Sequence, residues 1–68
     1  MKAELGSVVV DKEGERLGTV DYVIRNSWTG EISKYIIYRN PPETDISFRP
    51  NEILEVNSNE TIVNIYGN

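Results

Sequence analysis

The sequence predicts an all-β fold, a small closed barrel of about six short antiparallel strands. The apolar residues follow the two-residue period of strands, and no stretch shows the period of an amphipathic helix. Turn-forming residues divide the chain at short, regular intervals, as they do in small barrels. The 68 residues suffice for one domain, near the lower size limit for folding alone. Residues 1–68 are therefore predicted to be a single domain.

The first two predicted strands are separated by a charged turn. Residues 5–10 end in three valines, a β-branched residue typical of strands. Residues 16–26 form the second strand and alternate between apolar and polar side chains, except that Val23 places an apolar group on the polar side. This alternation predicts that three apolar side chains share one face: Val20, Tyr22 and Ile24.

Two glycines four residues apart, Gly14 and Gly18, are compatible with a phosphate-binding loop or with a tight β-turn. A phosphate loop needs a following helix whose N-terminal amides face the anion. Here Gly18 leads into a β-branched, alternating stretch instead. We interpret both glycines as structural: Gly14 supplies a positive φ in the turn, and Gly18 allows a bulge early in the second strand.

The third predicted strand, residues 31–39, follows a five-residue hairpin connection in which Gly30 is expected to be left-handed. Its centre is apolar on both faces. Either Tyr35 and Ile37 face the core while Ile36 and Tyr38 face outward, or the reverse. Two apolar faces in so small a domain predict an intermolecular contact, unless a terminal segment or the proline-rich loop covers one of them. Tyr35, Ile36 and Tyr38 are therefore candidate partner-binding residues.

The C-terminal half completes the predicted barrel. Two consecutive prolines exclude residues 40–45 from a central strand, so these residues are expected to form a surface loop. A turn at Pro50 and another at residues 57–60 separate the last three strands. These strands are predicted at residues 46–49, 53–56 and 61–66.

Trp28, at the tip of the predicted hairpin, is the foremost candidate for a partner contact. A large aromatic ring at a hairpin tip is poorly placed for the barrel interior, and tryptophan is a common interface anchor. The alternative is that the ring folds back over the end of the barrel, against Tyr35 or Tyr66.

The residue types present argue against an enzyme. The chain contains no histidine and no cysteine, so the commonest general base and the strongest nucleophile are missing. The acidic group Asp11, Glu13 and Glu15 lacks the spacing of a twelve-residue calcium loop and is expected to be a solvated turn. We therefore expect no catalytic residue, no metal and no cofactor.

Charge and composition restrict the partners. With 7 basic and 11 acidic residues, the net charge of −4 opposes nonspecific binding to nucleic acid. Arg25, Lys34 and Arg39 could form a basic strip across the hairpin, but a salt-bridged sheet face is the preferred interpretation. Without disulfides or a zinc site to stabilise so small a domain, a homodimer is expected. No signal peptide or membrane span is apparent, so a cytoplasmic location is expected.

Several segments occur in an order that resembles a known family. They are Gly14-Glu15-Arg16-Leu17-Gly18-x-Val20-x-x-Val23-Ile24, Thr29-Gly30-Glu31, Tyr35-Ile36-Ile37 and Phe48-x-Pro50. Over roughly residues 4–66 the chain is similar to the PRC-barrel family. The chain departs from the family pattern at Trp28, at Arg49 and in the proline-rich loop.

The resemblance implies a small SH3-like β-barrel with an adaptor role and no common catalytic residue. The family includes the cytoplasmic domain of the photosynthetic reaction centre H subunit and small, chiefly archaeal proteins, some of them linked to cell division. It implies a non-enzymatic protein-interaction module that docks on a larger complex, such as archaeal division or membrane-associated machinery. The alternative is a ribosome- or RNA-associated factor, by analogy with the C-terminal barrel of the ribosome maturation factor RimM.

Overall fold

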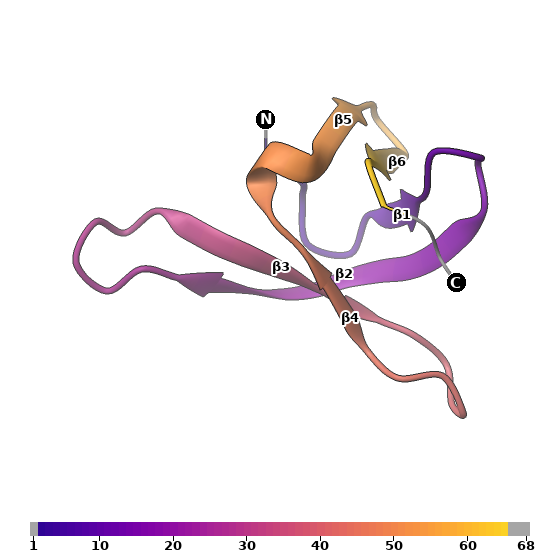
Figure 1. Cartoon of the computed structure of the whole chain (residues 1–68), viewed down its shortest axis with the longest axis horizontal. Helices are drawn as coiled ribbons and strands as arrows, with labels where there is room; N and C mark the ends of the chain where they lie inside the picture. The colour runs from indigo at the N-terminus through magenta and orange to yellow at the C-terminus, as the bar shows by residue number, and fades with distance from the viewer. Residues whose placement is uncertain (1, 66–68) are drawn as a thin grey trace.

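The computed structural model describes residues 2–65, which form six β-strands and one short 3-10 helix and contain no α-helix (Figure 1). The all-β class and the approximate positions of the strands are as predicted. The last strand begins and ends earlier than expected, and Tyr66 lies outside the described residues. In chain order the elements are β1 (Val8–Val10), β2 (Arg16–Arg25), β3 (Ile32–Tyr38), β4 (Ile46–Phe48), η1 (Pro50–Glu52), β5 (Ile53–Val56) and β6 (Glu60–Val63).

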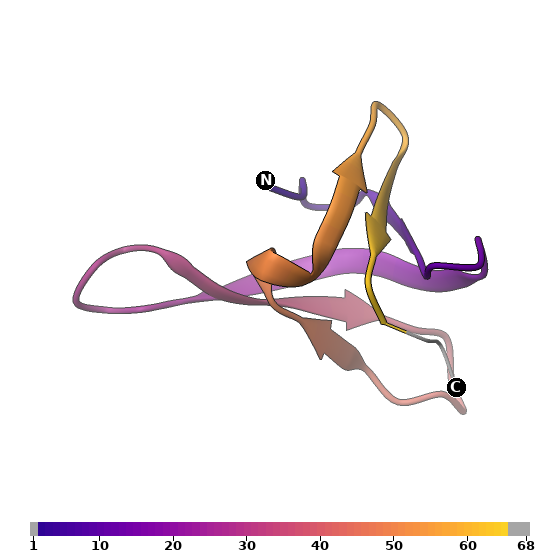
Figure 2. The same ribbon diagram turned by 45° about the horizontal axis from the view of Figure 1, so that its top comes forward.

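The strands form one curled sheet in the order β4-β3-β2-β1-β6-β5, a half-barrel. The predicted closed, wholly antiparallel barrel is wrong in two respects. The edge strands β4 and β5 do not pair with each other, so the barrel stays open, and β1 pairs with β6 in parallel. Figure 2 shows the reason for the open edge: the chain turns a corner through η1 between β4 and β5, so that β5 leaves β4 instead of returning beside it as in a hairpin.

The concave face of the sheet holds the hydrophobic core. Tyr35 and Phe48 are opposite each other on β3 and β4, and their rings stack with centroids 4.9 Å apart and an interplanar angle of 12°. The backbone N–H of Ala3 donates a hydrogen bond to the hydroxyl of Tyr35 over 3.2 Å, which ties the N-terminal segment to the core. The buried core residues are Ala3, Val9, Leu17, Val20, Tyr35, Ile37, Phe48, Ile53 and Val63.

The middle of β2 changes which face it presents to the core. Val20 is 2% exposed, whereas Tyr22 is 51% exposed, so the prediction that Val20, Tyr22 and Ile24 share one face is wrong. The physical reason is a register shift. Val20 pairs with Ile37 but Tyr22 pairs with Ile36, so that Asp21 is an extra residue on β2. Such a bulge reverses the side-chain alternation beyond it.

The glycines lie at turn and bulge positions. Gly14 and Gly30 have φ of 83° and 76° in the turns before and after β2. Gly18 pairs with Val9, and the register of β1 and β2 shifts directly beside it. A Cβ atom at Gly18 would lie 2.1 Å from the backbone carbonyl oxygen of Tyr38. Glycine at this position therefore allows the close approach of β2 to the end of β3.

Pro50 begins the 3-10 turn that joins β4 to β5. The turn is stabilised by reciprocal hydrogen bonds: the backbone N–H of Glu52 donates to the Arg49 carbonyl over 2.9 Å, and the Arg49 N–H donates to the Glu52 carboxylate over 2.8 Å. A fixed proline φ suits the first position of such a turn. The corner that keeps the half-barrel open is therefore encoded locally, by residues 49–52.

Candidate interaction surface

The β2–β3 hairpin extends beyond the core and ends in the connection that carries Trp28 (Figures 1 and 2). Asn26 organises this tip. Its side-chain oxygen accepts hydrogen bonds from the N–H groups of Trp28 and Thr29 over 2.8 and 3.3 Å. Its backbone N–H donates to the Glu31 carbonyl, and its carbonyl accepts from the Gly30 N–H, both over 2.8 Å. One asparagine thus holds both sides of the loop together.

Two further side chains fix the same loop. Arg25 donates from Nη1 to the Gly30 carbonyl over 2.9 Å, and the Thr29 hydroxyl accepts from the Glu31 N–H over 3.1 Å. None of these bonds uses the indole of Trp28. The neighbours of Trp28 therefore determine the conformation of the tip, and the indole ring projects from an ordered loop.

Trp28 is 94% exposed. The alternative that its ring folds back over the end of the barrel is wrong, because a ring exposed to this extent packs against almost nothing in the domain. Of the two contacts proposed for it, Tyr35 is fully buried in the core, and Tyr66 lies outside the described residues. Partner binding by Trp28 stays a prediction.

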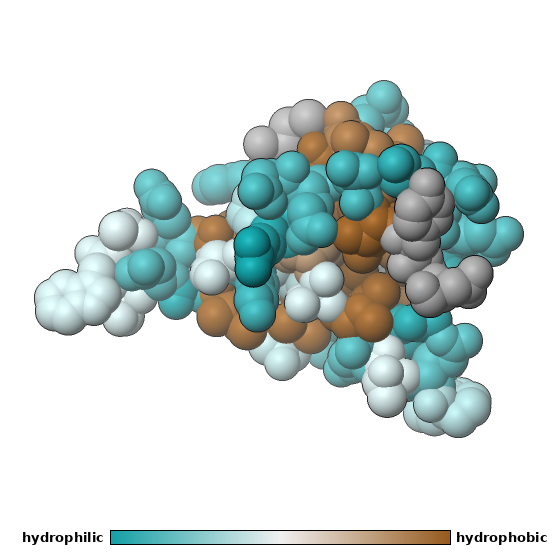
Figure 3. Space-filling view, in the orientation of Figure 1, coloured by the Kyte–Doolittle hydropathy of each residue, from teal (hydrophilic) through white to brown (hydrophobic). Residues whose placement is uncertain are grey.

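The outward side of the hairpin carries a second apolar surface, which we call the outer patch: Tyr22, Ile24, Ile36 and Tyr38. Tyr22 pairs with Ile36 across β2 and β3, and the three residues other than Ile36 are about half exposed. Figure 3 shows apolar surface along the lower margin of the hairpin. The sequence left open which side chains of the third strand face the core, and in the structure these are Tyr35 and Ile37. Tyr35 is too deeply buried to be a partner-binding residue without unfolding, which corrects its place among the candidates.

Sequence reasoning missed Tyr22 and Ile24 as surface residues, because it placed them on the same face as the buried Val20. The signal that could have found them is Val23, an apolar residue out of phase in the second strand. In the structure Val23 packs against the core, as the bulge at Asp21 requires.

A shallow hollow of 280 Å³ adjoins the outer patch. It is lined by Tyr22 and Ile36 of the patch and by Asp45, Ile46 and Ser47 at the start of β4. The exposed carboxylate of Asp45 therefore lies at the margin of the outer patch. Asp45 accepts a long hydrogen bond, 3.4 Å, from the N–H of Arg39.

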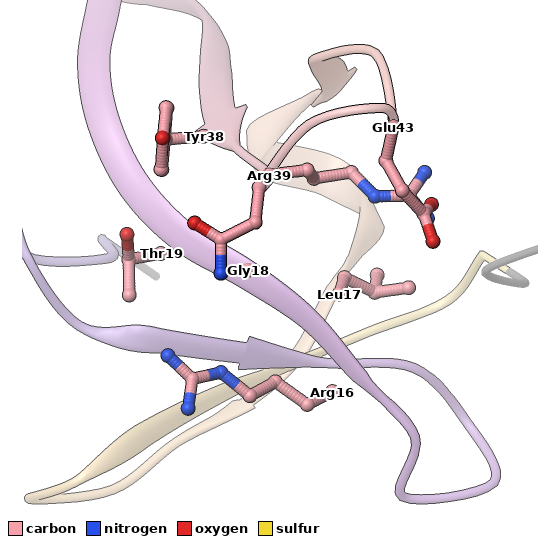
Figure 4. Close-up of a pocket in the computed structure, with 8 residues that line it drawn as sticks. Arg16, Leu17, Gly18, Thr19, Tyr38, Arg39 and Glu43 are labelled. Atoms are coloured by element: carbon pink, nitrogen blue, oxygen red, sulfur yellow. The ribbon is translucent and has the colours of Figure 1, made fainter.

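A larger pocket of 440 Å³ lies between the start of β2 and the end of β3 (Figure 4). Arg16 and Arg39 both line it, a pair that could in principle bind an anion. However, Arg39 extends toward Glu43, with which it forms an ion pair, and away from Arg16 (Figure 4). The pocket therefore does not bring two cations together.

The basic strip, the less favoured of the two interpretations of Arg25, Lys34 and Arg39, does not form. Arg25 is bound to the loop carbonyl of Gly30, and Arg39 is paired with Glu43. Lys34 lies beside Ile24 at the margin of the outer patch. The three cations have three different surroundings and do not compose one surface.

The acidic turn between β1 and β2 is organised by Asp11. Its carboxylate accepts hydrogen bonds from the N–H groups of Glu13 and Glu15, both over 2.9 Å, and the residue is buried. The expectation of a solvated turn is therefore wrong for Asp11, although Glu13 and Glu15 are exposed. Over residues 2–65 no group of three acidic, histidine or cysteine side chains is arranged to hold a metal ion.

Comparison of the sequence with protein-family models and with curated proteins finds no match. Among residues 2–65, no helix has the length and apolar character needed to cross a membrane. The interaction surfaces described above are therefore the basis for assigning a function.

Proposed function

We propose that this chain is a non-enzymatic protein-interaction module that docks on a larger complex through Trp28. The observation that supports this proposal is the 94% exposure of Trp28 on a hairpin tip fixed by its neighbours. Burying such a ring contributes a large apolar area, and an ordered loop loses little conformational entropy on binding. An anchor of this kind matches the central hot spots of protein interfaces.

The PRC-barrel resemblance supplies the setting of this proposal. By that resemblance the module would be an adaptor attached to division or membrane-associated machinery. We further propose that it acts in the cytoplasm as a homodimer, as expected for so small a domain. The net charge of −4 and the dispersed surroundings of Arg25, Lys34 and Arg39 favour a protein partner over RNA.

The test is an affinity pull-down from cell extract at moderate salt, read by mass spectrometry. Trp28→Ala is expected to weaken partner binding by about 2 kcal/mol or more, a typical hot-spot loss. Its free energy of unfolding should stay within about 0.5 kcal/mol of the wild type, because the ring makes no core contact. Urea unfolding of the same variant checks this.

Leu54→Ala is the matched control, since Leu54 is an exposed apolar residue on β5, away from the hairpin. It should recover the same proteins as the wild type. Equal recovery by Trp28→Ala would contradict the proposal, and recovery of small-subunit ribosomal proteins would favour the ribosome-associated alternative.

A further inference from the structure

We infer that the outer patch is the contact of a homodimer, in which two copies pack face to face with Lys34 of each copy beside Asp45 of the other. This inference rests on the homodimer named in the proposed function and is independent of Trp28. It identifies which surface self-associates and how the two copies are aligned.

The apolar part of the outer patch is too small to bind a second copy alone. Its half-exposed side chains offer about 300 Å² of apolar area, comparable to the largest patch on an ordinary monomer. A stable interface buries about 800 Å² on each partner. The polar margin of the patch must therefore take part in the contact, and the charges in that margin decide what can pack there.

The margin carries opposite charges at its two ends. Lys34 lies two residues from Ile36 toward the hairpin tip, opposite Ile24. On the neighbouring strand Ile46 pairs with Ile37, so Asp45 lies level with Tyr38, two residues from Ile36 in the other direction. At about 3.4 Å per residue, each charge is about 7 Å along the strands from the centre of the patch.

This placement is self-complementary. Consider two such faces packed against each other, with a two-fold axis in the plane between them. If the axis crosses the strands at right angles at Ile36, it reverses the strand direction of the second copy. Lys34 of one copy then lies level with Tyr38 and Asp45 of the other, and the same contact occurs twice. The flexible stem of a lysine can span the spacing of about 4.8 Å between neighbouring strands to reach the carboxylate.

Isologous contacts of this kind are the rule in two-fold dimers, where residue i meets residue j and residue j meets residue i. A different protein would need its own apolar patch with the same two charges in the opposite order. A second copy of this chain supplies that arrangement of Lys34 and Asp45, provided that the exposed Asp21 of each copy, beside Tyr22, stays solvated. The charge pattern therefore favours self-association at this face.

Reciprocal charge reversal tests the inference, with the oligomeric state measured by sedimentation equilibrium at moderate salt. Lys34→Asp places two carboxylates together at each contact, and Asp45→Lys places two ammonium groups together. Each variant alone is expected to dimerise about tenfold more weakly than the wild type, or worse. In an equimolar mixture of the two variants, a mixed dimer again pairs one carboxylate with one ammonium at both contacts, and dimerisation should return.

Glu55→Lys is the matched control, because it makes the same change in charge as Asp45→Lys at an exposed position on β5. It should dimerise as the wild type does. A monomeric wild type, single reversals that dimerise as well as this control, or a mixture that stays monomeric would each overturn the inference.

The docking and dimer proposals can fail separately. Trp28→Ala should remain a dimer, and loss of the dimer in this variant would place the self-contact at the hairpin tip and overturn the inference. If the charge reversals behave as expected while Trp28→Ala recovers the same proteins as the wild type, only the docking proposal fails.

Discussion

Gly18→Ala is expected to leave a large fraction of the molecules unfolded at 25 °C. The added Cβ would lie 2.1 Å from the carbonyl oxygen of Tyr38 and 2.8 Å from Cγ2 of Ile37. The first contact is with backbone, so β2 and β3 would have to separate where they begin to pair. Gly18 also has φ of 154°, which side chains rarely adopt. Together, strain and overpacking cost on the order of 4 kcal/mol, close to the total stability of a domain of this size.

Far-UV circular dichroism and urea unfolding measure this effect, with Gly14→Ala as the control. Gly14 also has a positive φ, but a Cβ there would meet no atom within 4 Å. Gly14→Ala should therefore cost only about 1 kcal/mol, the price of the backbone conformation alone. Equal losses at the two glycines would contradict a close approach of β2 and β3 at Gly18.

Phe48→Ala is expected to destabilise the domain by about 3–5 kcal/mol. Phe48 is fully buried on the edge strand β4 and stacks on Tyr35. Removal of its ring leaves a cavity against Tyr35 and takes away the main side-chain contact that holds β4 to the core. Since β4 has three residues and pairs with β3 alone, only this pairing and the partly buried Ile46 would still retain it.

Urea unfolding again measures the loss, and Leu54→Ala provides the comparison. Leu54 is half exposed on the other edge strand, so its truncation should cost less than about 1 kcal/mol. A loss at Phe48 no greater than the loss at Leu54 would mean that β4 does not pack on Tyr35 as described.

Local pattern was sufficient to predict where most strands lie. The fifth strand occupies residues 53–56 as expected, and the third is one residue shorter at each end than the predicted range. These positions follow from alternation and from turn residues, which act over a few neighbours. The glycines at 14 and 30 were predictable for the same reason, because a positive φ is a local requirement.

The pairing of distant strands was not predictable in this way. The parallel pairing of β1 with β6 joins Val9 to Thr61, about fifty residues apart, and no local pattern encodes it. The open edge is likewise a property of the corner at η1 and not of the number of strands. A six-strand count is compatible with a closed barrel and with a half-barrel.

Surface exposure was predictable only in part. Alternation allowed two orientations of the third strand, and the choice between them depends on the stacking of Tyr35 with Phe48, a tertiary contact. For the second strand, strict alternation gave the wrong answer because one extra residue at Asp21 reverses the faces. The candidate outer patch emerges only when both effects are known.

The most direct test of the central claim is the fluorescence of Trp28, which is the only tryptophan in the chain. In the isolated protein, the emission maximum and the acrylamide quenching should be close to those of a free tryptophan derivative. On addition of the purified partner recovered by pull-down, the emission should shift to the blue and the quenching should fall. Blue-shifted emission that is protected from acrylamide in the isolated protein would instead place the ring inside the domain and contradict its role as an exposed anchor.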